Sequence, residues 1–134
     1  MKSEPFKISD KLLEDNNKLD SNEIGKYAIE IAKEYFRSKD IDAQFEIPRK
    51  GEDLIVKSKN ESKLYEIKGS KMPEFRFKQL YISGQSSFEK IESKEAILMR
   101  IVNIGKQDVT ICFLEYDKDF ILEKVPRWII KKKK

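Results

Sequence analysis

Residues 51–69, with the sequence GEDLIVKSKNESKLYEIKG, decide the fold of this chain. Two runs rich in Leu, Ile, Val and Tyr flank a polar centre, KNES, whose composition is typical of a turn. The pattern therefore predicts a β-hairpin with a four-residue loop over residues 59–62. In that register Asp53 pairs with Lys68 across the two strands.

The two faces of this predicted hairpin differ in polarity. Asp53, Glu66 and Lys68 share one face, because residues paired across strands and residues two apart in a strand point the same way. Two carboxylates and a lysine at one end of a hairpin can bind Mg²⁺ and activate a water molecule. The alternative is an ordinary exposed strand face on which Glu and Lys alternate. The opposite face is apolar and consists of Leu54, Val56, Tyr65 and Ile67.

The pattern Glu-x-Lys occurs at residues 61–63, 66–68 and 92–94, so the pattern alone is weak. The first copy falls in the expected turn, and the third ends a polar helix. Only residues 66–68 lie inside an apolar strand, where two charges on one face are costly unless they have a purpose. We therefore take Glu66-Ile67-Lys68 as the candidate catalytic motif.

The composition limits the chemistry that this chain can perform. Its 134 residues include one cysteine and no histidine. This excludes catalytic pairs that need imidazole, histidine-ligated zinc and an intrachain disulfide. Carboxylates, lysines, hydroxyl groups and a hard metal ion remain as candidates for catalysis.

The net charge of +4 is concentrated at the C-terminus. Residues 120–134 hold six basic residues against one acidic residue, while the rest of the chain holds 22 basic against 23 acidic. A second basic stretch, residues 47–78, holds nine basic against five acidic residues. Basic clusters favour nucleic-acid phosphates, and the alternative is a solvated lysine surface.

The remaining sequence predicts one α/β domain. Apolar residues recur at helical spacing over residues 22–38, with Ser21-Asn22 as the expected N-cap, and a second helix is expected over 83–93. Helices on both sides of a central mixed sheet would form a three-layer sandwich. Strands are expected over residues 41–47, 53–58, 64–69, 74–83, 95–104 and 108–116.

We expect three segments along the chain. Residues 1–20 are a polar N-terminal arm or contain a short helix at 9–15, residues 21–130 form the domain, and residues 131–134 are a basic tail. No apolar run reaches the length of a membrane span, and the N-terminus lacks the apolar core of a signal peptide. These features favour a cytoplasmic protein without a membrane partner.

Three short motifs carry a resemblance to a known family. They are Gly25-x-x-Ala28 in the first helix, Gly51-x-Asp53, and Tyr65-Glu66-Ile67-Lys68-Gly69. In this order they resemble the PD-(D/E)xK nuclease superfamily. The layout over about residues 22–115 is most similar to its DUF3883 domain, which is related to the NO VEIN C-terminal domain.

The resemblance implies a restriction-endonuclease-like fold with an αβββαβ core and a dependence on Mg²⁺, or on Mn²⁺. It makes Asp53 and Glu66 the metal-binding carboxylates and Lys68 the catalytic lysine. The sequence departs from the family at Ile29, where a Glu often follows the helix Ala, and Glu30 comes one residue later. A third acidic ligand is therefore not assumed.

The sequence therefore predicts a metal-dependent endonuclease that hydrolyses phosphodiester bonds in nucleic acid, with DNA favoured over RNA. Its catalytic residues would be Asp53, Glu66 and Lys68. The alternative is a catalytically inactive nucleic-acid-binding or protein-interaction module on the same fold. Because the chain is small, we also expect a homodimer or a larger restriction or defence assembly.

Overall fold

The computed structural model describes residues 1–15, 23–48, 53–59, 61–74, 85–124 and 130–133. A six-stranded sheet with the order β1-β6-β5-β4-β3-β2 forms its centre. Strands β4 and β5 are parallel, and the other neighbours are antiparallel. In chain order the elements are β1 (Lys2–Lys7), α1 (Asp10–Asp15), α2 (Ile24–Lys39), β2 (Gln44–Glu46), β3 (Asp53–Ser58), β4 (Glu61–Gly69), α3 (Gln85–Glu92), β5 (Ala96–Val102) and β6 (Asp108–Leu114).

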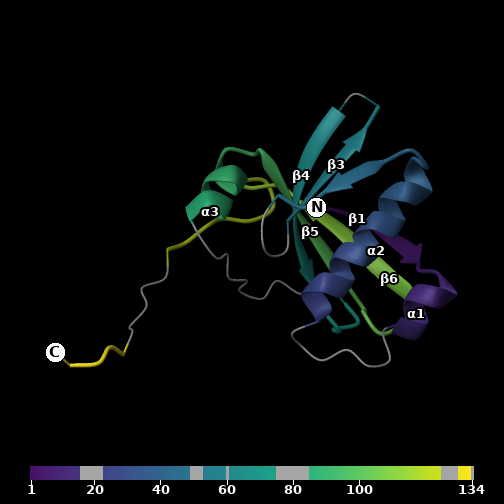
Figure 1. The fold of residues 1–134 in the computed structure, drawn as a ribbon. Helices are drawn as coiled ribbons and strands as arrows, with labels where there is room; N and C mark the ends of the chain where they lie inside the picture. Colours follow the sequence, from purple (N-terminus) through teal and green to yellow (C-terminus); the bar gives the residue numbers. More distant parts are fainter. Residues whose placement is uncertain (16–22, 49–52, 60, 75–84, 125–129, 134) are drawn as a thin grey trace.

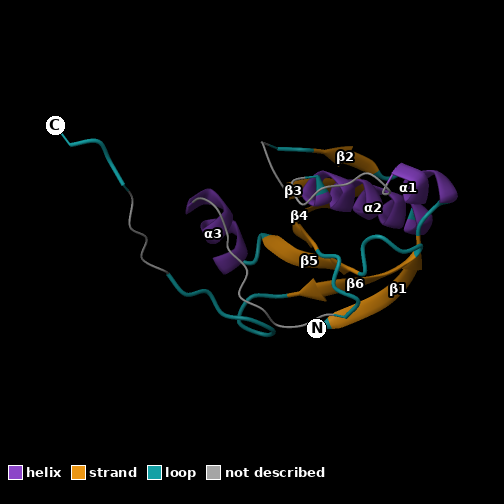
Figure 2. Cartoon of the chain, turned by 90° about the horizontal axis from the view of Figure 1, so that it is seen from below, coloured by secondary structure: helices purple, strands orange, loops and turns teal. Residues whose placement is uncertain are grey.

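Helices lie on both sides of the central strands. Figure 1 shows α2 and α3 on either side of β4 and β5, and the view in Figure 2 agrees. The prediction of an α/β chain with a mixed sheet flanked by helices is thereby confirmed. Within the described residues, no helix is long and apolar enough to cross a membrane.

Helix α2 supplies one half of the main core. The apolar stripe predicted for residues 22–38 faces the sheet, and α2 begins after Glu23, which makes no side-chain capping bond. The expected cap at Ser21-Asn22 lies outside the described residues. The packed residues include Ala28, Ile31 and Tyr35 from α2, and Leu54, Tyr65, Ile67, Met99 and Ile101 from the sheet.

The N-terminal residues contain a strand that the sequence did not predict. Lys2–Lys7 form β1, an edge strand that pairs antiparallel with β6. Pro5 disfavours the prediction of a strand because proline has no backbone N–H to donate. An edge strand tolerates such a residue. The short helix expected at 9–15 is present as α1. The pairing partner of β1 lies about a hundred residues away, so no local pattern indicated it.

The remaining elements differ from the prediction mainly in length. Strand β2 covers three residues rather than seven, and α3 spans Gln85–Glu92 inside the predicted 83–93. Most of the strand predicted at 74–83 lies outside the described residues. Residues 130–133 carry no secondary structure and are exposed.

Candidate functional site

The register of the central hairpin differs from the predicted one by two residues. Asp53 pairs with Glu66, so the predicted pairing of Asp53 with Lys68 is wrong. The connection has two residues rather than four, and Lys59 has a φ of 48°, the left-handed conformation that two-residue hairpin turns require. A shift of two residues keeps every side chain on its face. Positions 53, 66 and 68 therefore still share one face of the sheet.

Glu66 and Lys68 form an ion pair on this face. Lys68 Nζ lies 3.6 Å from Glu66 Oε1, and the two side chains are only 15% and 8% exposed. Taking such a pair out of water costs several kcal/mol per ion, and the attraction between the charges recovers this cost only in part. For Asp53 the structure gives the backbone position opposite Glu66, while its side chain lies outside the described part.

A close approach of α2 fixes the end of β4. A Cβ atom added at Gly69 would lie 2.8 Å from Ile104 Cδ1 and 2.9 Å from Ala28 Cβ. Only glycine allows the helix to pack so tightly against the strand. The motif that ends at Ala28 and the motif that ends at Gly69 thus meet here. The contact fixes the position of Lys68, which directly precedes Gly69.

Helix α2 adds no acidic group to the site. Ile29 is buried in the main core, whereas Glu30 is exposed and pairs with Lys33 at 3.4 Å. Because α2 covers the face of Leu54 and Ile67, it lies across the sheet from Glu66. Among the residues that the structure describes, no group of three His, Cys, Asp or Glu could hold a metal ion.

Arg100 is a further charged residue on the same face. The parallel register of β4 and β5 pairs Arg100 with Lys68, and Arg100 is 7% exposed. Burial lowers the pKa of its guanidinium. Arg100 was not among the residues predicted from the sequence, although a charge inside the apolar run AILMRIV is the same signal that indicated residues 66–68.

An apolar cluster lies next to Arg100 on the same face of the sheet, toward β6. Cys112 pairs with Arg100 across β5 and β6, and packs with Leu98 and Leu114. Burial raises the pKa of the Cys112 thiol, and the charge of Arg100 partly opposes this effect. A buried thiol with a raised pKa is a poor nucleophile, so Cys112 serves as a core residue.

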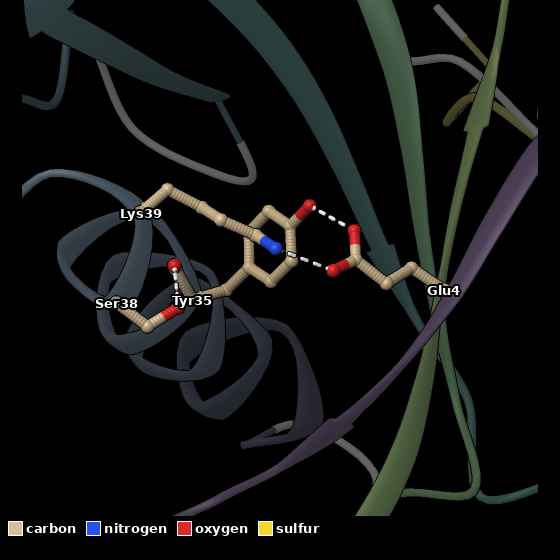
Figure 3. A network of polar contacts seen from close by, with 4 residues as sticks. All are labelled: Glu4, Tyr35, Ser38 and Lys39. Carbon is tan, nitrogen blue, oxygen red and sulfur yellow. Dashed lines mark hydrogen bonds and ion pairs between the residues drawn. The ribbon is translucent and has the colours of Figure 1, made fainter.

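A second polar network lies on the α2 side of the sheet (Figure 3). The Tyr35 hydroxyl donates to Glu4 Oε2 at 2.6 Å, and Lys39 Nζ donates to Glu4 Oε1 at 2.5 Å. The hydrogen bonds from Lys39 and Tyr35 lower the pKa of Glu4. Burial, with the bond to Glu4, raises the pKa of Tyr35. This network ties the last turn of α2 to the edge strand β1.

A surface depression of about 690 Å³ adjoins this network. Tyr35, Phe36, Tyr65 and Phe113 contribute aromatic rings to its lining, together with lysines and acids from β1, β4 and the segment after β6. Neither Glu66 nor Lys68 lines it. The depression is therefore separate from the candidate site.

The structure brings together Glu66 and Lys68, and places the backbone of Asp53 opposite Glu66. It adds Arg100 beside Lys68 and leaves Glu30 at the surface. No protein-family model, no curated protein and no solved structure matches the chain.

Proposed function

We propose that this chain is a metal-dependent nuclease of the PD-(D/E)xK type with a restriction-endonuclease-like fold. The observation that carries the proposal is the buried pair of Glu66 and Lys68 beside a strand position held by Asp53. A chain that needed only a stable sheet would gain as much from apolar residues there, since replacing a buried ion pair by apolar side chains is often neutral or stabilising.

The order of the elements supports the same proposal. From α2 onward the chain follows the pattern αβββαβ through β2, β3, β4, α3 and β5. Strands β4 and β5 are parallel, with α3 in the connection between them. The candidate residues lie on β3 and β4, which are the second and third strands of this pattern.

Glu66 and Asp53 would hold the metal ion. Mg²⁺ is commonly bound in proteins by one or two carboxylates, with water and substrate phosphate as further ligands. Register positions 53 and 66 face each other across the two strands, which is compatible with a two-carboxylate site. When bound, the ion lowers the pKa of a water molecule and stabilises negative charge on the phosphate.

Lys68 would act on the phosphate and on the attacking water. Hydrolysis forms a bond between the water oxygen and phosphorus, and breaks the bond from phosphorus to one ester oxygen. A lysine ammonium is a compact charge that can orient the water and neutralise charge on the phosphate oxygens. The ion pair with Glu66 holds Lys68 Nζ on the polar face of the hairpin, where the phosphate would bind.

Cleavage assays test the proposal directly. Plasmid DNA, linear duplex, single-stranded DNA and RNA are incubated with the chain in Mg²⁺, in Mn²⁺ and in EDTA. We expect cleavage that needs a divalent ion and falls at least about 100-fold in Asp53→Asn, Glu66→Gln and Lys68→Met.

The chain supplies its own matched control. Glu61 and Lys63 repeat the Glu-x-Lys spacing on the same strand but are exposed, at 74% and 55%. Glu61→Gln and Lys63→Met should therefore cleave like the wild type. Equal activity in all five variants, or no divalent-dependent cleavage of any substrate, would contradict the nuclease assignment.

The alternative function is a nucleic-acid-binding or protein-interaction module without catalysis. The exposed position of Glu30, which pairs with Lys33 away from the site, and the basic stretch 47–78 favour it. This module would bind nucleic acid in a salt-dependent manner, and the binding would survive Asp53→Asn and need no divalent ion. With either function, the proposed assembly is a homodimer or a larger complex.

A further inference from the structure

Arg100 is a buried charged residue next to the candidate site, and the proposed roles of Asp53, Glu66 and Lys68 do not account for it. It pairs with Lys68 in the parallel register of β4 and β5, so the two side chains leave the sheet on the same face. Backbones of neighbouring strands are about 4.8 Å apart. Arg100 and Lys68 therefore leave the sheet from neighbouring register positions, with Glu66 two residues before Lys68.

The guanidinium of Arg100 is buried without full compensation. The residue is 7% exposed, and its Nε atom is buried with no hydrogen-bond partner. None of the ion pairs found between described residues includes Arg100. Its neighbours on β5 and β6 are instead the apolar cluster of Leu98, Cys112 and Leu114.

Such a position is costly for a residue that cannot discharge itself. A guanidinium stays protonated at any physiological pH, and a buried charge without a partner destabilises the folded state. Leucine or methionine would fill the same space between Leu98 and Cys112 without this cost. The nearest carboxylate on β4, that of Glu66, is already paired with Lys68.

An anion that binds to the site would supply the missing partner. The planar fork of arginine matches the oxygens of a phosphate and can donate two parallel hydrogen bonds to it. The side chains of Glu66 and Lys68 are 8% and 15% exposed, and Arg100 is 7% exposed. Because Arg100 leaves the sheet from the register position next to Lys68, its long side chain can reach a phosphate bound at Lys68.

We propose that Arg100 binds a phosphate group of the nucleic-acid substrate beside Lys68. This inference rests on the proposed nuclease function and adds a fourth residue to its site. Arg100 contributes affinity and places the phosphate against Glu66 and Lys68. It takes no part in proton transfer, because it remains charged throughout.

Binding without cleavage is the decisive measurement. A fluorescein-labelled DNA duplex is titrated with the protein in Ca²⁺ in place of Mg²⁺, and anisotropy is recorded over a series of salt concentrations. We expect Arg100→Met to weaken binding by about 10-fold or more and to reduce the slope of log K against log salt by about one contact. Arg100→Lys keeps the charge but loses the fork, so its binding should fall between the two.

Arg37 provides the matched control. It is an exposed arginine on α2 whose guanidinium lies 4.9 Å from the centroid of the Phe45 ring, on the side of the sheet away from Glu66. Arg37→Met should leave affinity and salt slope unchanged. Thermal unfolding of each variant reports whether it is folded. If Arg100→Met does not fold, the affinity of Arg100→Lys tests whether Arg100 contributes to DNA binding.

The possible results separate the two proposals. Wild-type affinity and salt slope in a folded Arg100→Met, or in Arg100→Lys when the former is unfolded, would overturn the role of Arg100 and leave the nuclease proposal intact. Weaker binding by these variants, in a protein that never cleaves DNA, would support the phosphate contact and reject the nuclease. A wild type that binds no nucleic acid at all would overturn this inference.

Discussion

Gly69 lies so close to α2 that a Cβ atom added to it would stand 2.9 Å from the Cβ of Ala28. Carbon atoms in ordinary contact are about 3.5–4.0 Å apart, so a methyl group at Gly69 cannot be accommodated without movement. The residue follows Lys68 directly, at the end of β4. Any displacement of this strand end is therefore transmitted to the candidate site.

Gly69→Ala should destabilise the chain. Overpacking a close backbone contact costs about 1–3 kcal/mol. Here the added methyl group would force Ala28 Cβ in α2 and Ile104 Cδ1 to shift. Urea unfolding followed by circular dichroism measures the change. We expect a lower midpoint with an unchanged slope.

Ser62→Ala is the control for this variant, because Ser62 is an exposed residue on the same strand. It should leave the midpoint within about 0.5 kcal/mol of the wild type. A Gly69→Ala protein as stable as Ser62→Ala would show that α2 does not press on the strand end as described.

Metal binding should stabilise the folded chain through Glu66. A ligand that binds only the folded state raises the unfolding temperature in proportion to the logarithm of its concentration over its dissociation constant. Mn²⁺ should thus raise the melting temperature of the wild type and have little effect on Glu66→Gln. Glu61→Gln, which removes an exposed carboxylate from the same strand, should respond like the wild type; equal shifts in both variants would exclude Glu66 as a ligand.

The sequence was sufficient to predict which residues share the polar face of the hairpin, but not how they pair. Alternation along β3 and β4 places positions 53, 66 and 68 together whichever even register is used. The choice between pairing Asp53 with Lys68 or with Glu66 depends on the turn. Lys59 adopts a left-handed conformation that lysine rarely prefers, so the composition KNES favoured a longer loop.

The strand β1 and the role of Arg100 were not predictable in the same way. Residues 2–7 pair with β6, which lies about a hundred residues later in the sequence, and their period-two alternation of apolar residues is weak. The charge of Arg100 inside an apolar run was visible in the sequence. Its neighbour Lys68 became apparent only from the parallel register of β4 and β5.

Glu4→Gln should make the chain less sensitive to acid. The hydrogen bonds from Lys39 and Tyr35 lower the pKa of Glu4 below its ordinary value of 4.5. The folded state then binds a proton at Glu4 less readily than the unfolded state, so this contribution to stability is present above pH 4.5 and is lost as the pH falls through the lowered pKa.

Urea midpoints measured from pH 6 to pH 3 test this expectation. The wild type should lose stability more steeply than Glu4→Gln below about pH 4.5. Glu30→Gln serves as the comparison, since Glu30 is exposed and joined only to Lys33 among the ion pairs described. If the Glu4→Gln profile runs parallel to the wild type, the network in Figure 3 does not contribute through this carboxylate.

Tyr35→Phe should change the response to alkali. Burial raises the pKa of Tyr35 above its ordinary value of 10.0, and the bond to Glu4 raises it further. The contribution from Tyr35 is present below pH 10 and is lost as the pH rises above it, because the unfolded state releases its proton first. The loss of stability between about pH 9.5 and pH 11 should be shallower in Tyr35→Phe than in the wild type. Tyr116→Phe, outside the network, is the control, and an unchanged profile for Tyr35→Phe would contradict the assignment.

Cys112 should be protected from thiol reagents in the folded chain. It is 1% exposed and packs with Leu98 and Leu114, and burial raises the pKa of its thiol. The thiolate is the reactive species, so the raised pKa lowers the reactive fraction. Because the sulfur is also buried, modification requires the sheet to open. The rate with Ellman's reagent at pH 8 should be at least about 10³-fold below that of the same protein in urea, since opening of a core strand costs most of the global unfolding free energy. A native rate close to the unfolded rate would mean that the β5–β6 region is not packed as described.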